Sequence, residues 1–341
     1  MVEHPIEERI PFYDFNHILI DIKNSFITLN QKSQELVLLY QYLQNPEKIA
    51  FEKLDLLVGS PFPAFNVVSF GDDRLVILDD NSNKLHEYNL ETKKASVISD
   101  FGRGPGDFQF PLEMVKHHDM IYILREDMFL SVFDCKENPC LHNDDISLQF
   151  TPSSLATFKN KFAILGGRVD NENVEGTNSH QMLDYSKSVH IIDKNSEEIS
   201  SFGKIYDING HWMLHRPFVL NGKVRYGEYD DKFVLAFKPF PYIYIYDAND
   251  LRIENTFKLS DFLLSKQKYW PNERRLRTPE EDFSYINNIE VFNGHLLWIE
   301  VETKTNYRIT ESSILWDRKL DYYVIDLSDR ASYYMGYYEY K

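Results

Sequence analysis

The sequence predicts an all-β protein, a six-bladed β-propeller built from four-stranded antiparallel blades, and three observations support this fold class. Short runs of Val, Ile, Tyr and Phe recur along the 341 residues, and such residues favour strands. Clusters of Gly, Asp and Asn separate the runs at short spacing, as hairpin turns require. The runs also fall into groups of four that repeat after about 50 residues, a period typical of propeller blades.

The clearest repeat unit covers residues 64–111. Four strands are expected in it, at residues 66–70, 74–78, 84–90 and 95–101. Residues that tolerate turn conformations separate each strand from the next, so this unit is predicted to be a four-stranded meander.

The same pattern continues to the end of the chain and predicts six blades. Their expected ranges are 12–63, 64–111, 112–151, 152–214, 215–283 and 284–341. A meander leaves an open edge on each sheet unless the units close into a ring, so a single propeller domain over residues 1–341 is expected.

Three local expectations qualify this pattern. In the first blade, residues 33–44 fit strand and helical spacing alike, and both alternatives stay open. In the fifth blade, the first strand is expected at residues 218–224. Short helices are expected in the crossover insertions, one of them beginning at the capping box Thr278-Pro279-Glu280-Glu281.

The second unit carries residues that point to a family. An aliphatic strand ends in Asp at Leu75-Val76-Ile77-Leu78-Asp79, and a basic-aliphatic strand follows at Lys84-Leu85-His86-Glu87-Tyr88. A Gly-rich crossover comes next, at Phe101-Gly102-Arg103-Gly104-Pro105-Gly106-Asp107-Phe108, with Pro111 behind it. This pattern resembles the NHL-type repeat, and it is similar to the TolB-like six-bladed propeller proteins common in Bacteroidota. The resemblance implies the fold and says little about function.

Charge and hydropathy exclude several classes of partner. The formal net charge is −16, so this acidic protein is not expected to coat nucleic acid or anionic lipid. No run of apolar residues approaches the length of a membrane span. The first residues show no export signal, which predicts a cytoplasmic protein if Met1 is the native start. If a signal precedes this sequence, the family resemblance implies the periplasm or cell envelope.

Two cysteines are present, and their spacing allows two states. Cys135 and Cys140 flank Lys136-Glu137-Asn138-Pro139, a stretch that suits a short hairpin turn. They could be two reduced thiols, or they could close a small disulfide in an oxidising compartment. The sequence leaves both alternatives open.

Strand parity places the long insertions on one face of the predicted ring. In a four-stranded meander, the turn between the second and third strands lies on the same face as the crossover to the next blade. Four long segments fall on this crossover face, at residues 168–187, 206–215, 260–284 and 302–319. Long loops in a compact domain are usually functional or disordered, so the crossover face is the predicted binding surface.

The crossover at residues 260–284 has the most distinctive chemistry. Residues 265–277 carry five basic side chains against one acid, with Tyr269 and Trp270 among them. Arg forks and an aromatic platform suit an anionic ligand, a glycan acid or an acidic partner. The predicted rim residues are Lys266, Lys268, Tyr269, Trp270, Arg274, Arg275 and Arg277, together with His211, His215 and Arg216 from the preceding crossover.

Polar residues also begin several innermost strands, where they would line the mouth of the channel. These residues are Asn16, Asn66, Glu113, Asn287 and Asn288. Asn and Glu oxygens suit calcium, and the related lyases and calcium-dependent lactonases hold a cation at this place. The metal ligands themselves cannot be assigned from the sequence, and no cofactor is expected apart from calcium under this reading.

No catalytic residue is identified. The chain lacks the Gly-x-Ser-x-Gly elbow of serine hydrolases, and the Gly-rich stretch at residues 102–106 lacks the Lys-Ser/Thr pair of a phosphate-binding loop. The sequence therefore favours a non-catalytic module that binds a protein, a peptide or an anionic or glycan ligand on its crossover face. The alternative is a metal-assisted hydrolase or lyase with its site at the channel mouth.

Overall fold

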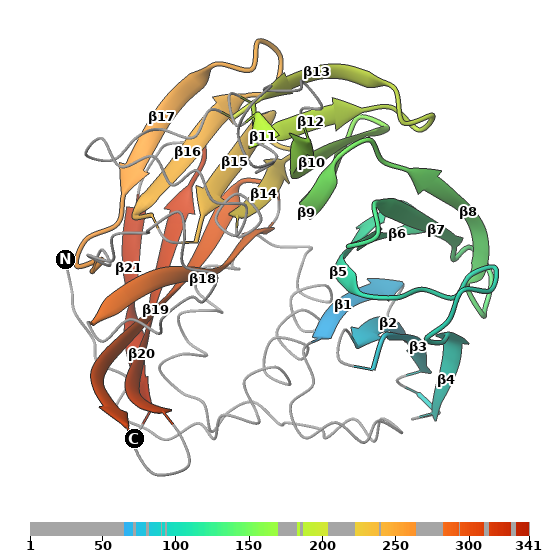
Figure 1. The fold of residues 1–341 in the computed structure, drawn as a ribbon, viewed down its shortest axis with the longest axis horizontal. Coiled ribbons are helices and arrows are strands. Elements are labelled where there is room, and N and C mark those ends of the chain that lie inside the picture. Colours follow the sequence, from blue (N-terminus) through green and yellow to red (C-terminus); the bar gives the residue numbers. More distant parts are fainter. Residues whose placement is uncertain are drawn as a thin grey trace, which may run out of the picture. The chain divides into compact units, whose positions relative to one another are not determined.

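Every regular element that the structure describes is a β-strand. The computed structural model describes residues 65–70, 73–79, 82–89, 91–92, 94–169, 183–184, 187–203, 222–238, 240–263, 282–292, 294–309, 314–328 and 332–340. These residues form two compact units, one up to Leu148 and the other from Gln149 onwards. The strands make five antiparallel sheets, and the fold is an all-β antiparallel propeller with five described blades (Figure 1).

The first unit contains two blades. Each is a meander of four strands that pair in chain order. The strands of the first are β1 (Phe65–Phe70), β2 (Arg74–Asp79), β3 (Lys84–Asn89) and β4 (Lys94–Ser99). Those of the second are β5 (Pro111–His117), β6 (Met120–Arg125), β7 (Phe129–Asp134) and β8 (Leu141–Ser147).

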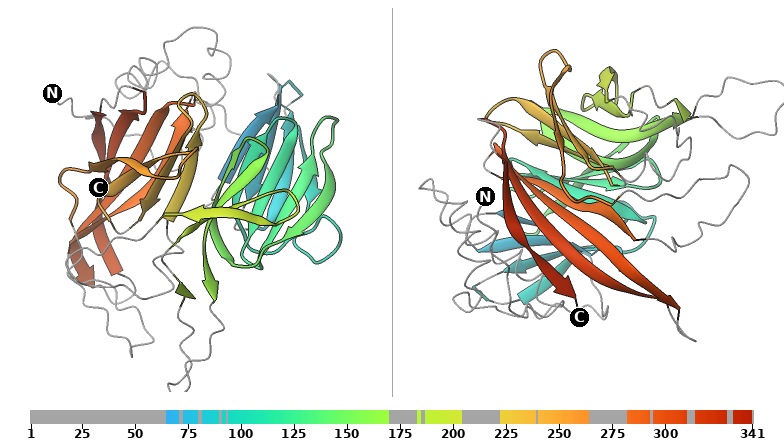
Figure 2. Two further views of the ribbon diagram at one scale, coloured as in Figure 1. Left: turned by 90° about the horizontal axis from the view of Figure 1, so that it is seen from above. Right: turned by 90° about the vertical axis from the view of Figure 1, so that its left-hand side faces the viewer.

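The second unit contains three blades. The first of them has β9 (Thr151–Phe158), β10 (Lys161–Val169), β12 (Val189–Ile192) and β13 (Glu198–Phe202), with the short β11 (Leu183–Asp184) paired to the end of β10. The next has β14 (Gly222–Gly227), β15 (Lys232–Phe237), β16 (Tyr242–Asp247) and β17 (Ile253–Lys258). The last blade has β18 (Phe283–Phe292), β19 (Leu296–Ile309), β20 (Ile314–Asp326) and β21 (Ser332–Tyr340), drawn in orange and red in Figure 2.

The burial of each strand depends on its place in the blade. All residues of β2 after Arg74 are buried, and β15 shows the same pattern after Lys232. The outer strand β17 instead alternates between half-buried and exposed residues. Middle strands are covered on both faces and are therefore rich in apolar residues, whereas outer strands have one face in water.

The core lies between neighbouring blades of the same unit. In the first unit, Phe70 and Leu78 of one blade share a cluster with Ile121 and Phe133 of the next. In the second unit, β15 and β16 contribute to a cluster with β18, β19 and β20. Burial of these side chains holds adjacent sheets face to face, because apolar burial stabilises by about 25 cal/mol per Å².

The structure corrects three expectations about strands and helices. Five blades are described where the sequence predicts six, and the expected first blade at residues 12–63, with the undecided segment 33–44, lies outside the described residues. No helix occurs in the described ranges, and the predicted helix start at Thr278–Glu281 lies outside them. The predicted end of the fifth blade's first strand at Val224 is wrong, because β14 runs on to Gly227.

Two predicted loops are strand extensions instead. Residues 302–309 continue β19 and residues 314–319 begin β20, so the expected loop at 302–319 is a two-stranded ribbon. Residues Arg168 and Val169 likewise pair with β11, which shortens the expected loop at 168–187 from both ends. In both places the sequence is rich in polar residues, as in a loop, whereas the structure pairs the backbone with a neighbouring strand.

Two further observations concern the compartment and the membrane. The two cysteines are joined as a Cys135–Cys140 disulfide, which decides between the two states that the sequence allows. In the part of the chain that the structure describes, no helix is long and apolar enough to cross a membrane.

Candidate ligand-binding site on the last blade

Most of the predicted rim lies beyond the described residues. This applies to all seven basic and aromatic residues between Lys266 and Arg277, to His211, His215 and Arg216, and to Asn16 at the predicted channel mouth. Their roles stay predictions. The described channel-mouth residues are Asn66, Glu113, Asn287 and Asn288.

These four residues are divided between the two compact units. Asn66 lies on β1 opposite Leu78 and is half-buried, and Glu113 lies on β5 with 1% of its surface exposed. Both are in the first unit, whereas Asn287 and Asn288 lie on β18 in the second. Among the described residues, no group of three or more His, Cys, Asp or Glu side chains is placed to hold a metal ion.

A β-bulge on β18 brings Asn287 to a buried carboxyl group. Ile286 pairs with Val301 and Asn288 with Glu300, so Asn287 is the extra residue of the bulge. A bulge redirects the side chain of its extra residue. Here the Nδ2 amide of Asn287 donates a hydrogen bond to Oε1 of Glu300. The structure therefore places Asn287 in a polar cluster, where its partner is a carboxyl group that the sequence reading did not select.

Glu300 is protonated over a wider pH range than an ordinary glutamate. Only 4% of its surface is exposed. Burial disfavours the charged form and raises the pKa of Glu300 to about 7, and the negative charge of Glu302 acts in the same direction. The hydrogen bond from Asn287 and the charge of Arg318 oppose this rise.

Glu302 lies two residues further along β19, on the same face of the strand, and behaves in the opposite way. Burial alone would raise its pKa, but hydrogen bonds from Arg318 and Tyr285 hold the pKa of Glu302 below its ordinary value. The Nε of Arg318 lies 2.5 Å from Oε1, and the Tyr285 hydroxyl donates to Oε2. The Lys304 ammonium lies 3.7 Å from Oε1. The two neighbouring carboxyl groups thus differ in charge near neutral pH, because only Glu302 is hydrogen-bonded to a cation.

Four partly exposed side chains cover this cluster and form what we call the last-blade patch: Phe283, Tyr285, Lys304 and Arg318. Cross-strand pairing joins Phe283 to Lys304 and Lys304 to Arg318, so these side chains share one face of the sheet. The rings of Phe283 and Tyr285 stack with centroids 6.0 Å apart. The Lys304 ammonium lies 5.2 Å from the Tyr285 centroid and 6.0 Å from that of Phe283.

The patch retains contact with solvent. The side chains of Lys304 and Arg318 are 25% and 34% exposed, against 2% for Glu302 beneath them. The opposite face of the blade carries Ile299 and Val301, which pack in the cluster shared with β15 and β16. The last-blade patch therefore lies on the face turned away from the preceding blade.

The patch is also next to the predicted basic crossover. The backbone N–H of Ser284 donates to the carbonyl of Leu263 at 2.8 Å, and the N–H of Leu263 donates to the Ser284 hydroxyl at 3.0 Å. These bonds hold together the two described ends of the crossover at residues 260–284. Because Phe283 directly precedes Ser284, the crossover leaves and returns beside the patch.

A second polar network joins the first strands of three successive blades in this unit. The Arg225 guanidinium on β14 makes two bonds to the Glu290 carboxylate on β18, at 3.0 and 3.1 Å. Its Nη1 lies 3.2 Å from the hydroxyl of Ser154 on β9. Arg225 is 8% exposed, and this bidentate geometry suits a structural tie. The sequence reading missed all three residues.

Comparisons with known proteins agree with the fold. No protein-family model matches the chain, and no curated protein matches it either. A solved member of the DUF4221 family from Bacteroides vulgatus is similar over 82% of this chain and 81% of that chain, with a TM-score of 0.50 and 9% sequence identity. A likeness at this identity indicates the fold alone.

Two further solved structures are similar at lower TM-scores. Hydrazine synthase from Kuenenia stuttgartiensis has a TM-score of 0.47 and 10% identity, over 83% of this chain and 71% of that chain. Streptogramin B lyase has a TM-score of 0.46 and 9% identity, over 85% of this chain and 87% of that chain. These likenesses do not bear on the ligand or on any reaction.

Proposed function

We propose that the protein is a non-catalytic binding module that takes a carboxylate-bearing ligand at the last-blade patch. The observation that carries this proposal is the placement of two partly exposed cations, Lys304 and Arg318, beside the stacked rings of Phe283 and Tyr285. Cations next to a rigid aromatic surface provide both charge and contact area for an anionic ligand.

The local charge supports an anionic ligand on a protein that is acidic overall. Lys304 and Arg318 contribute two positive charges, and Glu302 contributes one negative charge. Glu300 is largely neutral below pH 7, because burial raises its pKa to about 7. The cluster therefore carries a net positive charge at and below neutral pH, on a chain whose formal charge is −16.

The burial of the carboxyl groups favours binding over catalysis. A general acid or base must come within hydrogen-bond reach of the atom that it protonates or deprotonates. Glu300 and Glu302 are 4% and 1% exposed, so a ligand on the patch does not contact them. In this proposal Glu302 positions Arg318 and Tyr285 through its hydrogen bonds, and Glu300 positions Asn287.

The basic crossover belongs to the same proposal. Lys266, Arg274, Arg275 and the other basic residues of that segment are predicted to extend the site, since both described ends of the crossover lie beside Phe283. The proposed partner is thus an acidic glycan, peptide or protein segment with several carboxylates.

The test compares two lysines on opposite faces of the same ribbon. Lys304→Gln removes a cation from the patch, and Lys319→Gln removes one that pairs with Asp321 at 2.8 Å on the other face. Binding of polygalacturonate and of polyglutamate is measured by calorimetry. Loss of a charge-assisted contact should weaken binding by about tenfold for Lys304→Gln, with Lys319→Gln close to wild type. Equal effects of both variants, or binding by neither polymer, would contradict the proposal.

The same titration addresses the metal-assisted alternative. It is repeated with added calcium and with a chelator, while the polymer is monitored for chain cleavage. Binding that is the same in both conditions, with an intact polymer, supports the binding module. Cleavage that depends on calcium would favour the hydrolase or lyase.

A further inference from the structure

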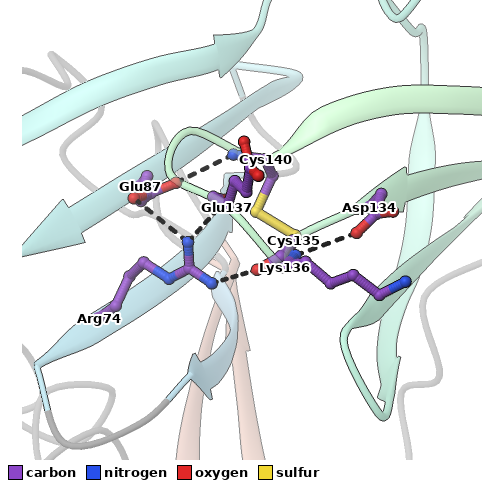
Figure 3. Close-up of a disulfide and its surroundings, with 7 residues drawn as sticks. All are labelled: Arg74, Glu87, Asp134, Cys135, Lys136, Glu137 and Cys140. Atoms are coloured by element: carbon purple, nitrogen blue, oxygen red, sulfur yellow. Dashed lines mark hydrogen bonds and ion pairs between the residues drawn. A yellow bond between two sulfur atoms is a disulfide. The ribbon is translucent and has the colours of Figure 1, made fainter.

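The disulfide lies at a joint between two blades of the first unit. Cys135 and Cys140 close the turn that connects β7 to β8, with their Cα atoms 4.2 Å apart (Figure 3). The cysteines are 1% and 3% exposed. They belong to the apolar cluster that contains Phe70 and Leu78 of the neighbouring blade.

Two side chains of the neighbouring blade bind the backbone of this turn. Arg74, at the start of β2, donates through Nη2 to the carbonyl of Cys135 and through Nη1 to the carbonyl of Glu137 at 2.9 Å. Glu87 on β3 accepts a hydrogen bond from the N–H of Cys140 at 3.2 Å. The Nη1 of Arg74 and the Oε1 of Glu87 also lie 4.0 Å apart as an ion pair, so the two side chains bind the turn as a connected pair (Figure 3).

The contacts depend on the shape of the turn. Carbonyl groups of Cys135 and Glu137 and the N–H of Cys140 must face the neighbouring blade at the same time. Within its own blade, the turn is fixed at one end, where the N–H of Cys135 donates to the carbonyl of Asp119 at 2.7 Å. The disulfide ties the other end to this fixed point, which reduces the conformations that the free turn could adopt.

We propose that oxidation of Cys135 and Cys140 locks the joint between the blades β1–β4 and β5–β8, and that the protein matures where a thiol oxidant is present. In this step, two thiols lose two protons and two electrons, and a sulfur–sulfur bond forms. The oxidant is a protein or peptide disulfide, whose own bond breaks and which leaves as two thiols. The proposed compartment is therefore an oxidising one, as in the second of the two alternatives that the sequence leaves open.

Because both cysteines are buried, this disulfide is a structural one and does not exchange readily with thiols in solution. A reductant reaches the sulfur atoms only after the turn leaves Arg74 and Glu87, so reduction of the native protein should be slower than reduction of the unfolded chain. The proposal is independent of the last-blade patch, which belongs to the other unit.

The first experiment determines the redox state and its effect on the turn. The full chain is produced in an oxidising and in a reducing compartment, and free thiols are counted by alkylation in denaturant followed by mass spectrometry. We expect no free thiol in the first preparation and two in the second. Hydrogen exchange at residues 135–140 should be faster in the reduced protein and should return to the oxidised rate after treatment with glutathione disulfide.

A double-mutant cycle then tests the lock itself. The variants are Cys135→Ser/Cys140→Ser, Arg74→Met and their combination, with Arg125→Met as a control arginine that pairs within its own blade. Closing a loop of this size should change the unfolding equilibrium by about 30-fold on the chain-entropy model. Arg74→Met should cost stability in the oxidised protein and much less in the cysteine-free protein, whereas the effect of Arg125→Met should be the same in both.

Several outcomes would overturn the proposal. Free thiols in the protein from the oxidising compartment would do so, as would equal exchange at residues 135–140 with and without the disulfide, or an equal effect of Arg74→Met in both backgrounds. If the cysteine-free chain does not fold, Arg74→Met with the disulfide intact provides the test. Exchange of the Cys140 amide should then rise while exchange in β14–β17 stays unchanged, and no rise would contradict the lock.

Discussion

Replacing Glu300 by Gln should change how the stability of the protein depends on pH. The pKa of Glu300 is about 7 in the folded protein, against 4.5 for an ordinary glutamate, mainly because the side chain is buried. Between these two values, the folded state keeps the proton and the unfolded state releases it. The contribution of Glu300 to the free energy of unfolding is therefore fully present below pH 4.5. It falls as the pH rises from 4.5 to 7 and is constant above pH 7.

The size of the effect follows from the two pKa values. Each pH unit between 4.5 and 7 costs about 1.4 kcal/mol, so the total loss is about 3 kcal/mol. Glutamine is neutral at every pH and can still accept the hydrogen bond from Asn287. The Glu300→Gln variant should therefore resemble wild type near pH 4.5 and exceed its free energy of unfolding by about 3 kcal/mol at pH 8.

The assay is urea unfolding of wild type and variant in parallel from about pH 3.5 to 8.5, because other titrating groups then cancel in the difference. Glu302→Gln is the matched control. Arg318 and Tyr285 lower the pKa of Glu302 after burial has raised it, so this variant should be less stable than wild type at pH 8. This deficit in the free energy of unfolding should shrink as the pH falls below 4.5, the ordinary pKa of a glutamate. A difference between Glu300→Gln and wild type that does not vary with pH would refute the reasoning.

Two further predictions concern structural residues. Arg225→Met should lower the free energy of unfolding by about 2–3 kcal/mol, because it removes charged hydrogen bonds from a site that is 8% exposed. The control Arg252→Met replaces an exposed arginine and should have little effect in the same urea assay. Gly106→Ala should cost about 1–3 kcal/mol, since Gly106 has a φ of 82° and a Cβ there would lie 2.9 Å from the Cβ of His142. Gly104→Ala is the control, because its Cβ would meet only the end of the Asp107 side chain. Equal thermal stability of the two glycine variants would contradict this explanation.

The strands that the sequence predicts well are those bounded by strong turn residues. The four strands expected in residues 64–111 agree with β1–β4 to within two residues at each end. The first strand of the fifth blade shows why other boundaries fail. The expected strand ends at Val224, but β14 continues to Gly227. The polar Arg225 that follows Val224 is buried and bonds to Glu290 and Ser154 on neighbouring blades, which the local sequence does not show.

The ribbon of the last blade shows a second limit. Residues 302–309 and 317–319 are mostly polar, a composition that is as typical of a loop as of a paired ribbon. Pairing of the backbone is what makes them strands. A four-strand pattern based on apolar runs cannot detect such an extension.

The candidate site could be predicted only in part. Asn287 was selected as a polar residue at a strand entry, but its partner Glu300 had a signal that was not used. Glu300 and Glu302 flank Val301 directly after the apolar run Leu296-Leu297-Trp298-Ile299 and so share one face of the strand. Arg225 and its partners had no such signal. Ser154 lies 71 residues before Arg225 and Glu290 lies 65 residues after it, so only the tertiary structure brings them together.

Hydrogen exchange with and without polygalacturonate would test the binding proposal most directly. Bound polymer should slow exchange at the start of β18 and in residues 302–305 and 317–320, and it should leave β14–β17 unchanged. At a polymer concentration near the wild-type Kd, the slowing should be much smaller in Lys304→Gln than in wild type and unchanged in Lys319→Gln. Slowing that is confined to other strands, or that is equally strong in Lys304→Gln, would show that the ligand binds elsewhere on the protein.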